Sequence, residues 1–412
     1  MKILIVSQFF YPETGAASNR VYELGRMFAG KGHSLSVLTT FPNYPKGKLF
    51  DGYEKSSFHH EEIEGIKVYR VPSFISKYTS ALSRARSYLS FTLNAIRNFK
   101  RIEKADIVIG TSGPVFVMFT AYFISKRLGI PCVLEVRDIQ SKALRATGLI
   151  GKAIPINIIS SIEKYFLGRA DMIVVVTKKY KLEIMEALKK EEQRVEVIAN
   201  GMDFSRKPIK PSNGGLTDLY KRIKKKKSEG LQVISYFGNM GVTQRVGELF
   251  QKFTKQKNDE FIFLIFGNGA EEGIISSLSD ENSNLLYHES IPEEELMLFY
   301  GLSDFNIVKI LDHPELSSMV PLKLYTIMGH GNVPVFIGPE GEAAEIIGKV
   351  ESGLCFRDDE IDSILPFCAS MDKDKKYMLK SKFLEFTRTN FNREDQAERY
   401  LEVLLKCLPD VR

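Results

Sequence analysis

Two hydrophobic patterns alternate along this chain. A continuous apolar run at 2–10 (KILIVSQFF) leads through a polar loop to 21–28 (VYELGRMF), where apolar residues recur every three or four positions. A second apolar run follows a glycine at 32–40 (GHSLSVLTT). The short runs are typical of buried strands, and the spaced pattern is typical of an amphipathic helix. This strand–loop–helix–strand order predicts the first unit of a doubly wound parallel sheet.

The same alternation continues to the end of the chain and divides into two series. A chain of 412 residues is too long for one ordinary core, so two domains are expected. We predict an α/β fold with two Rossmann-like doubly wound domains that face a cleft, where the carboxyl ends of both sheets bind ligands. The N-terminal domain is predicted at 1–205 and the C-terminal domain at 206–390, and helix 391–412 is expected to pack back on the first. Further strands are predicted at 67–71, 106–109, 132–136, 171–176, 195–198, 233–237, 261–266, 285–288, 305–309 and 333–337.

The charge is mildly basic, with 57 Lys and Arg against 51 Asp and Glu. Part of the excess is local, at 221–227 (KRIKKKK) and at 84–101, which contains no acidic residue. Such runs are usually solvated helix faces. The functional alternative is attraction to anionic lipid or to a phosphorylated substrate. No RNP, zinc-finger or helix-turn-helix signature accompanies the charge, so no nucleic-acid partner is expected.

Cysteine and histidine give no sign of a metal site. The four cysteines lie among apolar neighbours without metal-ligand spacing, which indicates free thiols in a reducing compartment. We place His59 and His60 in a loop. No signal peptide is visible, so a cytoplasmic protein is expected. The uncharged stretch 107–125 is interrupted by GTSGP at 110–114, which predicts a strand and a helix, each too short to span a bilayer.

Several enzyme classes lack their motifs here. The dinucleotide-binding fingerprint is absent after the first strand, and GNGAEEG at 267–273 has the wrong spacing and position. Neither a Walker A lysine motif nor a G-x-S-x-G elbow occurs. The triplet DKD at 372–374 is surrounded by lysines, so we interpret it as an exposed helix face.

The remaining candidate loops suit a phosphorylated sugar. In ELSSMVPLKLYTIMGHG (315–331), Pro321 opens a predicted helix and Lys323 lies in its first turn, an arrangement that favours a phosphate. Gly15 lets a backbone approach a ligand, and GNMGVTQR (238–245) repeats the arrangement and adds Arg245. The strand end EVRDIQ (135–140) carries charge at the predicted cleft. Tight turns and ordinary strand ends remain the alternative interpretations of these loops.

These segments together resemble a family 4 glycosyltransferase of the two-Rossmann (GT-B) type. The resemblance is strongest to bacterial enzymes of capsule and O-antigen synthesis that use UDP-linked acetamido sugars. It runs nearly from end to end of the chain. The segments that carry it are QFFYPETGAASNRVYEL, TTFPNYPKGKLFDGY, LEVRDI, VIANGMD, YFGNMGVTQ, LYHESIPEEELMLFYGLSDFNIV, VPLKLYTIMGHGNVPVF and EGEAAEII.

The resemblance implies a retaining transfer without a metal or other cofactor, from a UDP-sugar held in the second domain. It implies that backbone N–H groups and cations stabilise the leaving diphosphate. The residues that it assigns to the diphosphate are Gly15, Asn239, Arg245, Ser318, Met319, Val320 and Lys323. The residues that it assigns to the nucleoside are His288, Ile291 and Thr326. Those on the sugar and acceptor side are Glu13, Thr14, Asn43, Tyr44 and Glu345. The candidate catalytic residues are Arg137 and Asp138.

The sequence departs from this family at one end of the nucleotide site. The pair of acidic residues that the family carries in this helix falls on Ser318 and Thr326. A threonine makes a neutral and weaker hydrogen bond to ribose than a carboxylate does. HGNVPVF (330–336) also replaces the family's usual GKPVI. The phosphate end of the site therefore matches the family, and the ribose end is altered.

The sequence therefore predicts a cytoplasmic glycosyltransferase at the inner face of the plasma membrane. Its expected partners are a UDP-sugar, a lipid-linked glycan acceptor and, through 80–104, an anionic membrane surface. Two alternatives stay open. A UDP-sugar 2-epimerase shares the fold but needs an acid–base pair that Arg137 and Asp138 do not convincingly form. A non-catalytic GT-B subunit is favoured by the altered ribose end at Thr326.

Overall fold

The structure is a computed structural model that describes residues 1–13, 15–44, 47–75, 81–148, 156–189, 191, 194–241, 243–256 and 259–409. The chain forms two compact units. The N-terminal unit comprises Met1–Ala199 together with Glu394–Arg412, and the C-terminal unit comprises Asn200–Arg393. Along the sequence, the boundaries between the two units thus lie a few residues from the predicted domain limits, 1–205 and 206–390.

The N-terminal unit is built on an eight-stranded sheet in the order β3-β4-β2-β1-β5-β6-β7-β8. All neighbouring strands pair in parallel except β3 and β4, which are antiparallel. The parallel strands are short, and all except β8 at the sheet edge are almost wholly buried, because helices cover both faces of the sheet. The strands are β1 (Lys2–Val6), β2 (Ser34–Thr40), β3 (His59–Ile63), β4 (Ile66–Val71), β5 (Ile107–Thr111), β6 (Cys132–Val136), β7 (Met172–Val175) and β8 (Val195–Val197).

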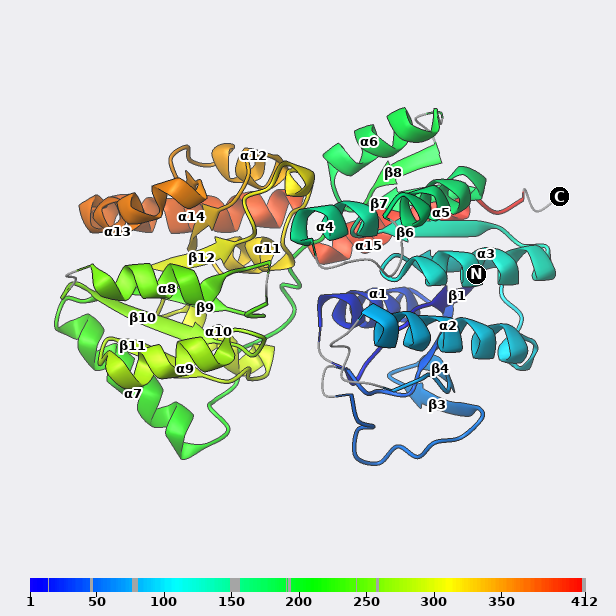
Figure 1. Ribbon diagram of the computed structural model, residues 1–412, viewed down its shortest axis with the longest axis horizontal. Coiled ribbons are helices and arrows are strands. Elements are labelled where there is room, and N and C mark those ends of the chain that lie inside the picture. The colour runs from blue at the N-terminus through cyan, green and yellow to red at the C-terminus, as the bar shows by residue number, and fades with distance from the viewer. Residues whose placement is uncertain are drawn as a thin grey trace. The chain divides into compact units, whose positions relative to one another are not determined.

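Helices cover both faces of this sheet (Figure 1), and a hydrophobic core lies on each face. One face packs against α2 (Ala81–Asn98), α3 (Val115–Leu128), α5 (Ile156–Arg169) and α6 (Lys178–Leu188). The other face packs against α1 (Ala16–Gly30) and the C-terminal helix α15 (Arg393–Leu405), whose Tyr400 ring meets Phe28 edge-on at 5.8 Å. Two short helices complete the unit: η1 (Phe99–Arg101) and α4 (Gln140–Thr147).

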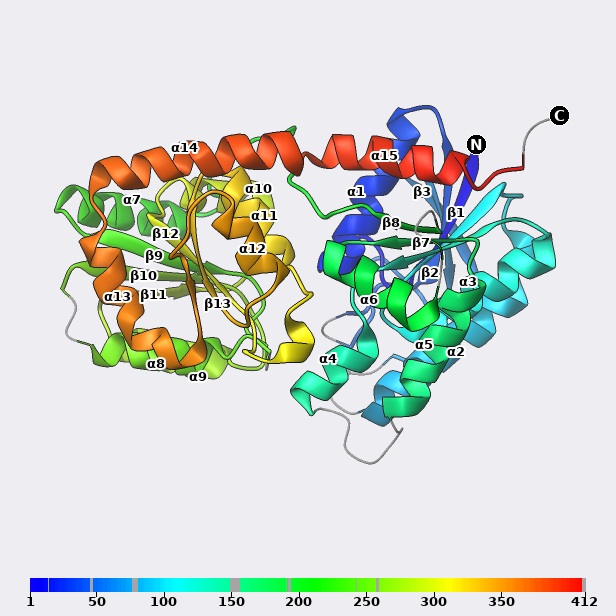
Figure 2. The same cartoon turned by 90° about the horizontal axis from the view of Figure 1, so that it is seen from above.

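The C-terminal unit has a fully parallel six-stranded sheet in the order β11-β10-β9-β12-β13-β14. Its helices again lie on both faces of the sheet (Figure 2). The strands are β9 (Gln232–Phe237), β10 (Phe261–Phe266), β11 (Leu285–His288), β12 (Phe305–Lys309), β13 (Val333–Ile337) and β14 (Cys355–Phe356). The helices are α7 (Gly214–Ser228), α8 (Val246–Lys255), α9 (Glu272–Glu281), α10 (Glu293–Tyr300), η3 (Pro314–Leu316), α11 (Leu322–Gly329), α12 (Glu342–Gly348), η4 (Asp358–Glu360), α13 (Ile361–Ser370) and α14 (Lys373–Asn390).

The predicted fold class, two doubly wound α/β domains, is confirmed by these two sheets. The turn GTSGP also separates β5 from α3 as predicted, and none of the helices in the described ranges is long and apolar enough to cross a membrane. The prediction of a loop at His59 and His60 is wrong, because both residues lie in β3. This strand lies at the sheet edge and is polar on both faces, so it lacks the apolar signal of the other strands. The two-residue strand β14 was not predicted either.

Candidate functional site

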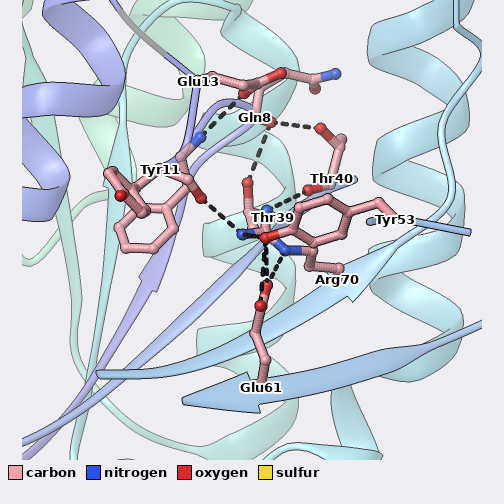
Figure 3. A network of polar contacts seen from close by, with 9 residues as sticks. Gln8, Tyr11, Glu13, Thr39, Thr40, Tyr53, Glu61 and Arg70 are labelled. Carbon is pink, nitrogen blue, oxygen red and sulfur yellow. Dashed lines mark hydrogen bonds and ion pairs between the residues drawn. The ribbon is translucent and has the colours of Figure 1, made fainter. Parts of the chain in front are cut away.

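A buried arginine lies at the carboxyl edge of the N-terminal sheet, beneath the loops that follow β1 and β2 (Figure 3). Arg70, near the end of β4, has 0% of its surface exposed. Its Nη1 donates to the Thr40 carbonyl at 3.0 Å, its Nη2 donates to the Tyr11 carbonyl at 2.7 Å, and its Nε donates to the Glu61 carboxylate. The Tyr53 hydroxyl bonds to the same carboxylate. Arg70 therefore ties both loops to the sheet.

Glu13 joins the same two loops from the other side. Its carboxylate accepts from the backbone N–H groups of Asn43 and Tyr44, both at 2.8 Å, and from that of Phe10 at 3.3 Å. Burial raises the pKa of Glu13 to about 7, although these N–H groups lower it. The structure thus gives Glu13 a role in holding the loops, and a direct contact of Glu13 with a sugar stays a prediction. Thr14, predicted beside it, lies outside the described residues.

Gly15 caps the N-terminus of α1 in an extended conformation. A Cβ atom placed on it would lie more than 4 Å from every heavy atom of the described residues beyond its own chain neighbours. Crowding by the described residues therefore does not explain the glycine, and a contact between Gly15 and the donor diphosphate stays a prediction.

The strand end EVRD contributes one structural and two candidate catalytic residues. Glu135 is buried and pairs with Arg20 at 2.9 Å, so its charge is used within the protein. The Arg137 Nη2 donates to the Ser112 carbonyl at 2.6 Å, but its Nε has no hydrogen-bond partner in the part of the chain that the structure describes. Burial lowers the pKa of Arg137. Asp138 follows with its side chain exposed, two residues before α4.

In the C-terminal unit, the Lys323 ammonium is buried and has no counterion among the residues that the structure describes. It lies in the first turn of α11, and its Nζ lies 3.9 Å from the centre of the Tyr236 ring. A Cβ atom on Gly238 would be 3.1 Å from this Nζ, so the loop after β9 lies against it. The Nζ is buried and has no hydrogen-bond partner among the described residues. Burial lowers the pKa of Lys323 to about 7.

The loop before α11 is held by a close approach of two backbones. A Cβ atom on Gly341 would lie 1.9 Å from the Ser317 carbonyl oxygen, so only glycine fits there. The next N–H group, of Glu342, donates to the same oxygen at 2.9 Å. The segment upstream of this loop is fixed by ion pairs from Lys309 to Asp358 and from Arg357 to Asp312. This packing sets the position of the three predicted diphosphate residues Ser318, Met319 and Val320.

The other residues predicted to bind the donor lie at the ends of strands in the same sheet or in the loops and helices that follow those strands. Asn239 directly follows the glycine that lies against Lys323, and its side chain bonds to Gln244 at 3.3 Å. Arg245 is exposed at the N-terminus of α8 with a left-handed φ of 44°. His288 ends β11, and its Nδ1 lies 2.8 Å from the Glu289 carbonyl. The remaining predicted residues lie in the loop after β11 (Ile291), in α11 (Thr326) and in the first turn of α12 (Glu345).

Several of these positions were not predicted from the sequence. Arg70 and Tyr236 lie inside strands, where the sequence pattern indicates only burial. Gly341 lies in a quoted motif, but the close approach that requires glycine involves a segment distant in sequence. A charged residue inside a predicted strand, as at Arg70, is only a weak signal, because Lys67 in the same strand is also charged but only half-buried.

The arrangement in the C-terminal unit suits an anion. A desolvated ammonium without a partner is costly, and an anionic ligand would supply the missing charge. The N-terminus of α11 adds backbone N–H groups to this position. No cluster of three or more potential metal ligands occurs among the residues that the structure describes.

Comparison with known proteins gives matches over one domain and over the whole chain. Residues 15–201 match the family described as the glycosyl transferase 4-like domain. A relative, the putative colanic acid biosynthesis glycosyl transferase WcaI of Escherichia coli (strain K12), is 22% identical over 340 residues, which are 80% of this chain and 82% of the relative.

Solved structures share the fold over nearly the full length. Sucrose-phosphate synthase from Thermosynechococcus elongatus has a TM-score of 0.75 and 13% identity, covering 98% of each chain. Anabaena Alr3699/HepE in complex with UDP and glucose has a TM-score of 0.69 and 13% identity, covering 98% of this chain and 100% of that one. The predicted resemblance to GT-B glycosyltransferases is confirmed.

Proposed function

Because this chain is a glycosyltransferase with an N-terminal glycosyl transferase 4-like domain, we propose that it transfers a sugar from UDP, with retention of configuration, to a lipid-linked or growing surface glycan. The observation that carries the donor part of the proposal is the buried Lys323 ammonium, which lacks a counterion among the described residues. It lies where an α-helix begins and a parallel strand ends, a position in which both structural elements favour an anion.

In this proposal the diphosphate of the donor occupies the space beside Lys323 and the loop 318–320. Cleavage of the bond to the sugar leaves negative charge on the diphosphate. Lys323, Arg245 and the backbone N–H groups of the loop stabilise that charge, and this lowers the barrier to transfer. The charge of the leaving group is then balanced without a metal ion at the chemical step.

The nucleotide part of the proposal is UDP. HepE, which shares the fold, has been solved with UDP and glucose and with UDP-glucose. His288 and Ile291 would face the base, and Thr326 would bond to the ribose. On the sugar side, Glu345 would meet the transferred ring, and Arg137 and Asp138 would act at the reacting centre, where the partly unpaired guanidinium of Arg137 supports its role.

The membrane part of the proposal rests on the exposed face of α2. Leu82, Leu89 and Leu93 are 62%, 49% and 44% exposed. Arg86 lies between Leu82 and Leu89, and Arg97 follows Leu93, so that all five side chains share one face of the helix. Apolar and basic side chains on one helix face suit an anionic lipid surface. We therefore propose that the enzyme works at the inner face of the plasma membrane. The protein should co-sediment with phosphatidylglycerol vesicles and be released by salt, and equal binding to neutral vesicles would contradict this placement.

The experiment that tests the function is a screen of nucleotide sugars with lipid-linked glycan extracts from bacteria. UDP release that depends on both donor and acceptor supports the proposal, and NMR of the new anomeric centre tests retention. Conversion of the sugar nucleotide without an acceptor would instead indicate an epimerase. A protein that fails to bind UDP in calorimetry would contradict the donor assignment.

A further inference from the structure

Two tyrosine side chains are exposed on the loops that Arg70 and Glu13 hold together. Tyr11, in the loop after β1, is 42% exposed, and Tyr44, in the loop after β2, is 39% exposed. We propose that Tyr11 and Tyr44 form a stacking site for a sugar ring of the acceptor glycan, and that Arg70 and Glu13 are its positioning residues. This inference rests on the proposed transferase function and deepens it, because it names the part of the acceptor that is bound.

Each exposed ring is supported by a second aromatic ring. Tyr11 stacks on Tyr22 with ring centres 4.6 Å apart and an interplanar angle of 18°. Tyr44 packs against Phe9 at 5.2 Å. A ring held in this way loses little freedom when a ligand binds, so that more of the contact energy appears as affinity.

The backbones that carry the two rings are fixed by charged groups. The Tyr11 carbonyl accepts from Arg70 at 2.7 Å, and the Tyr44 N–H donates to Glu13 at 2.8 Å. Both charged side chains are almost wholly buried, with 0% of Arg70 and 2% of Glu13 exposed. Such a supporting layer of hydrogen bonds gives a binding surface a defined geometry (Figure 3).

The chemistry of these loops favours a neutral ring over a phosphate. All three guanidinium nitrogens of Arg70 donate to groups inside the protein, and the Glu13 carboxylate accepts three backbone N–H groups. The hydrogen-bonding groups of Arg70 and Glu13 are therefore already satisfied inside the protein, and the loops present aromatic faces. A pyranose ring fits such a surface, because its C–H groups are slightly positive and the face of an aromatic ring is slightly negative.

The test uses the full chain and methyl pyranosides of glucose, galactose, rhamnose and N-acetylglucosamine as probes. Saturation-transfer NMR and titration measure sugar binding, and calorimetry with UDP measures the donor site in the same samples. The variants are Tyr11→Ala and Tyr44→Ala, with Tyr11→Phe and Tyr44→Phe as conservative forms. Tyr165→Ala is the matched control, since Tyr165 is a 49% exposed tyrosine on α5 of the same unit.

We expect at least one pyranoside to bind the parent protein and to bind each alanine variant roughly two- to tenfold more weakly, as for the loss of one aromatic contact. The phenylalanine variants and Tyr165→Ala should bind it as the parent does, and UDP affinity should be unchanged throughout. Equal pyranoside affinity in the alanine variants, or no pyranoside binding to a parent that binds UDP, would overturn the stacking site. Failure of the parent to bind UDP would instead count against the proposed donor.

Discussion

Arg70 in the N-terminal unit and Lys323 in the C-terminal unit are both buried cations at the carboxyl edge of a parallel sheet, but their surroundings differ. Each nitrogen of Arg70 donates to an oxygen of the protein, whereas the Lys323 Nζ has no partner among the described residues. A fully paired buried cation holds a structure together, and an unpaired one destabilises it until an anion arrives. Two buried cations in similar topological positions can therefore have different roles: one stabilises the loops of its domain, and the other is available to bind a ligand.

The largest effect that this comparison predicts is on stability. Arg70→Met should destabilise the N-terminal unit by roughly 3–5 kcal/mol, because it removes the donor to two carbonyl oxygens and leaves the Glu61 carboxylate with only the Tyr53 hydroxyl. Urea unfolding measures the change. Arg26→Met is the matched control: Arg26 pairs with Glu64 on the surface, where such a pair contributes at most about 1 kcal/mol. Similar losses in the two variants would show that Arg70 does not hold the loops.

The next effect concerns the loop that precedes α11. Gly341→Ala should displace Ser317 and the diphosphate residues after it, since the added Cβ meets backbone atoms that cannot rotate away. Strain of this kind costs roughly 1–3 kcal/mol, which corresponds to a loss of UDP affinity of about five- to hundredfold. Gly348→Ala, at the other end of α12, places its Cβ in open space and should leave UDP affinity unchanged. Calorimetry of the two variants decides whether this close approach positions the loop.

The unpaired lysine should show opposite effects on stability and binding. Lys323→Met should weaken UDP binding by roughly 1–3 kcal/mol, as for a lost charged hydrogen bond. The same change should raise the melting temperature of the ligand-free protein, because it removes a desolvated charge. The matched control is Lys376→Met, which removes a lysine that bonds to Gln232 at 2.9 Å. Lower stability of ligand-free Lys323→Met would show that this ammonium is already stabilised in the protein.

The pH dependence of the parent protein sharpens this test. The pKa of Lys323 is lowered to about 7 in the folded chain and keeps its ordinary, higher value in the unfolded chain. Above pH 7 the unfolded chain therefore binds more protons, so the ligand-free protein should gain stability as the pH rises. UDP affinity should fall over the same range, because the ammonium loses its charge. Lys323→Met should lack both of these contributions.

The smallest predicted effect lies at the ribose end. Thr326→Glu should strengthen UDP binding by roughly 1–2 kcal/mol if a carboxylate at this position reaches the ribose hydroxyls. The melting temperature should stay the same. A lower melting temperature would mean that the longer side chain is buried without a partner. Unchanged affinity in a protein of unchanged stability would place the ribose elsewhere.

Local sequence patterns predicted the fold, but they did not predict the tertiary contacts that join the loops. Every predicted strand is present, because each is a short apolar run bounded by turn residues. Two strands were not predicted. Both β3 and β14 lie at a sheet edge, and β14 has only two residues, so neither shows the apolar pattern of a buried strand. Lys323 was predicted as a phosphate ligand from its place in the first turn of a helix, but its missing partner depends on Tyr236 and Gly238, which are distant in sequence.

Glu13 and Gly341 show the same limit from the other side. The sequence marks both as site residues or parts of site motifs. Their roles depend on contacts that only folding creates, between Glu13 and the N–H groups of Asn43 and Tyr44, and between Gly341 and Ser317. A motif identifies which residues belong to a site. Whether a residue contacts the ligand or holds another residue in place depends on tertiary contacts.

The C-terminal helix α15 makes the N-terminal unit discontinuous in sequence, and this has a consequence for synthesis on the ribosome. Ala397, Tyr400 and Leu404 complete the core on the α1 face of the first sheet, but they are translated only after the whole C-terminal unit. Contacts of such large sequence separation form slowly. The nascent first sheet therefore waits with one apolar face partly uncovered while the second domain is made, and exposed apolar surface of this kind is where chaperones act.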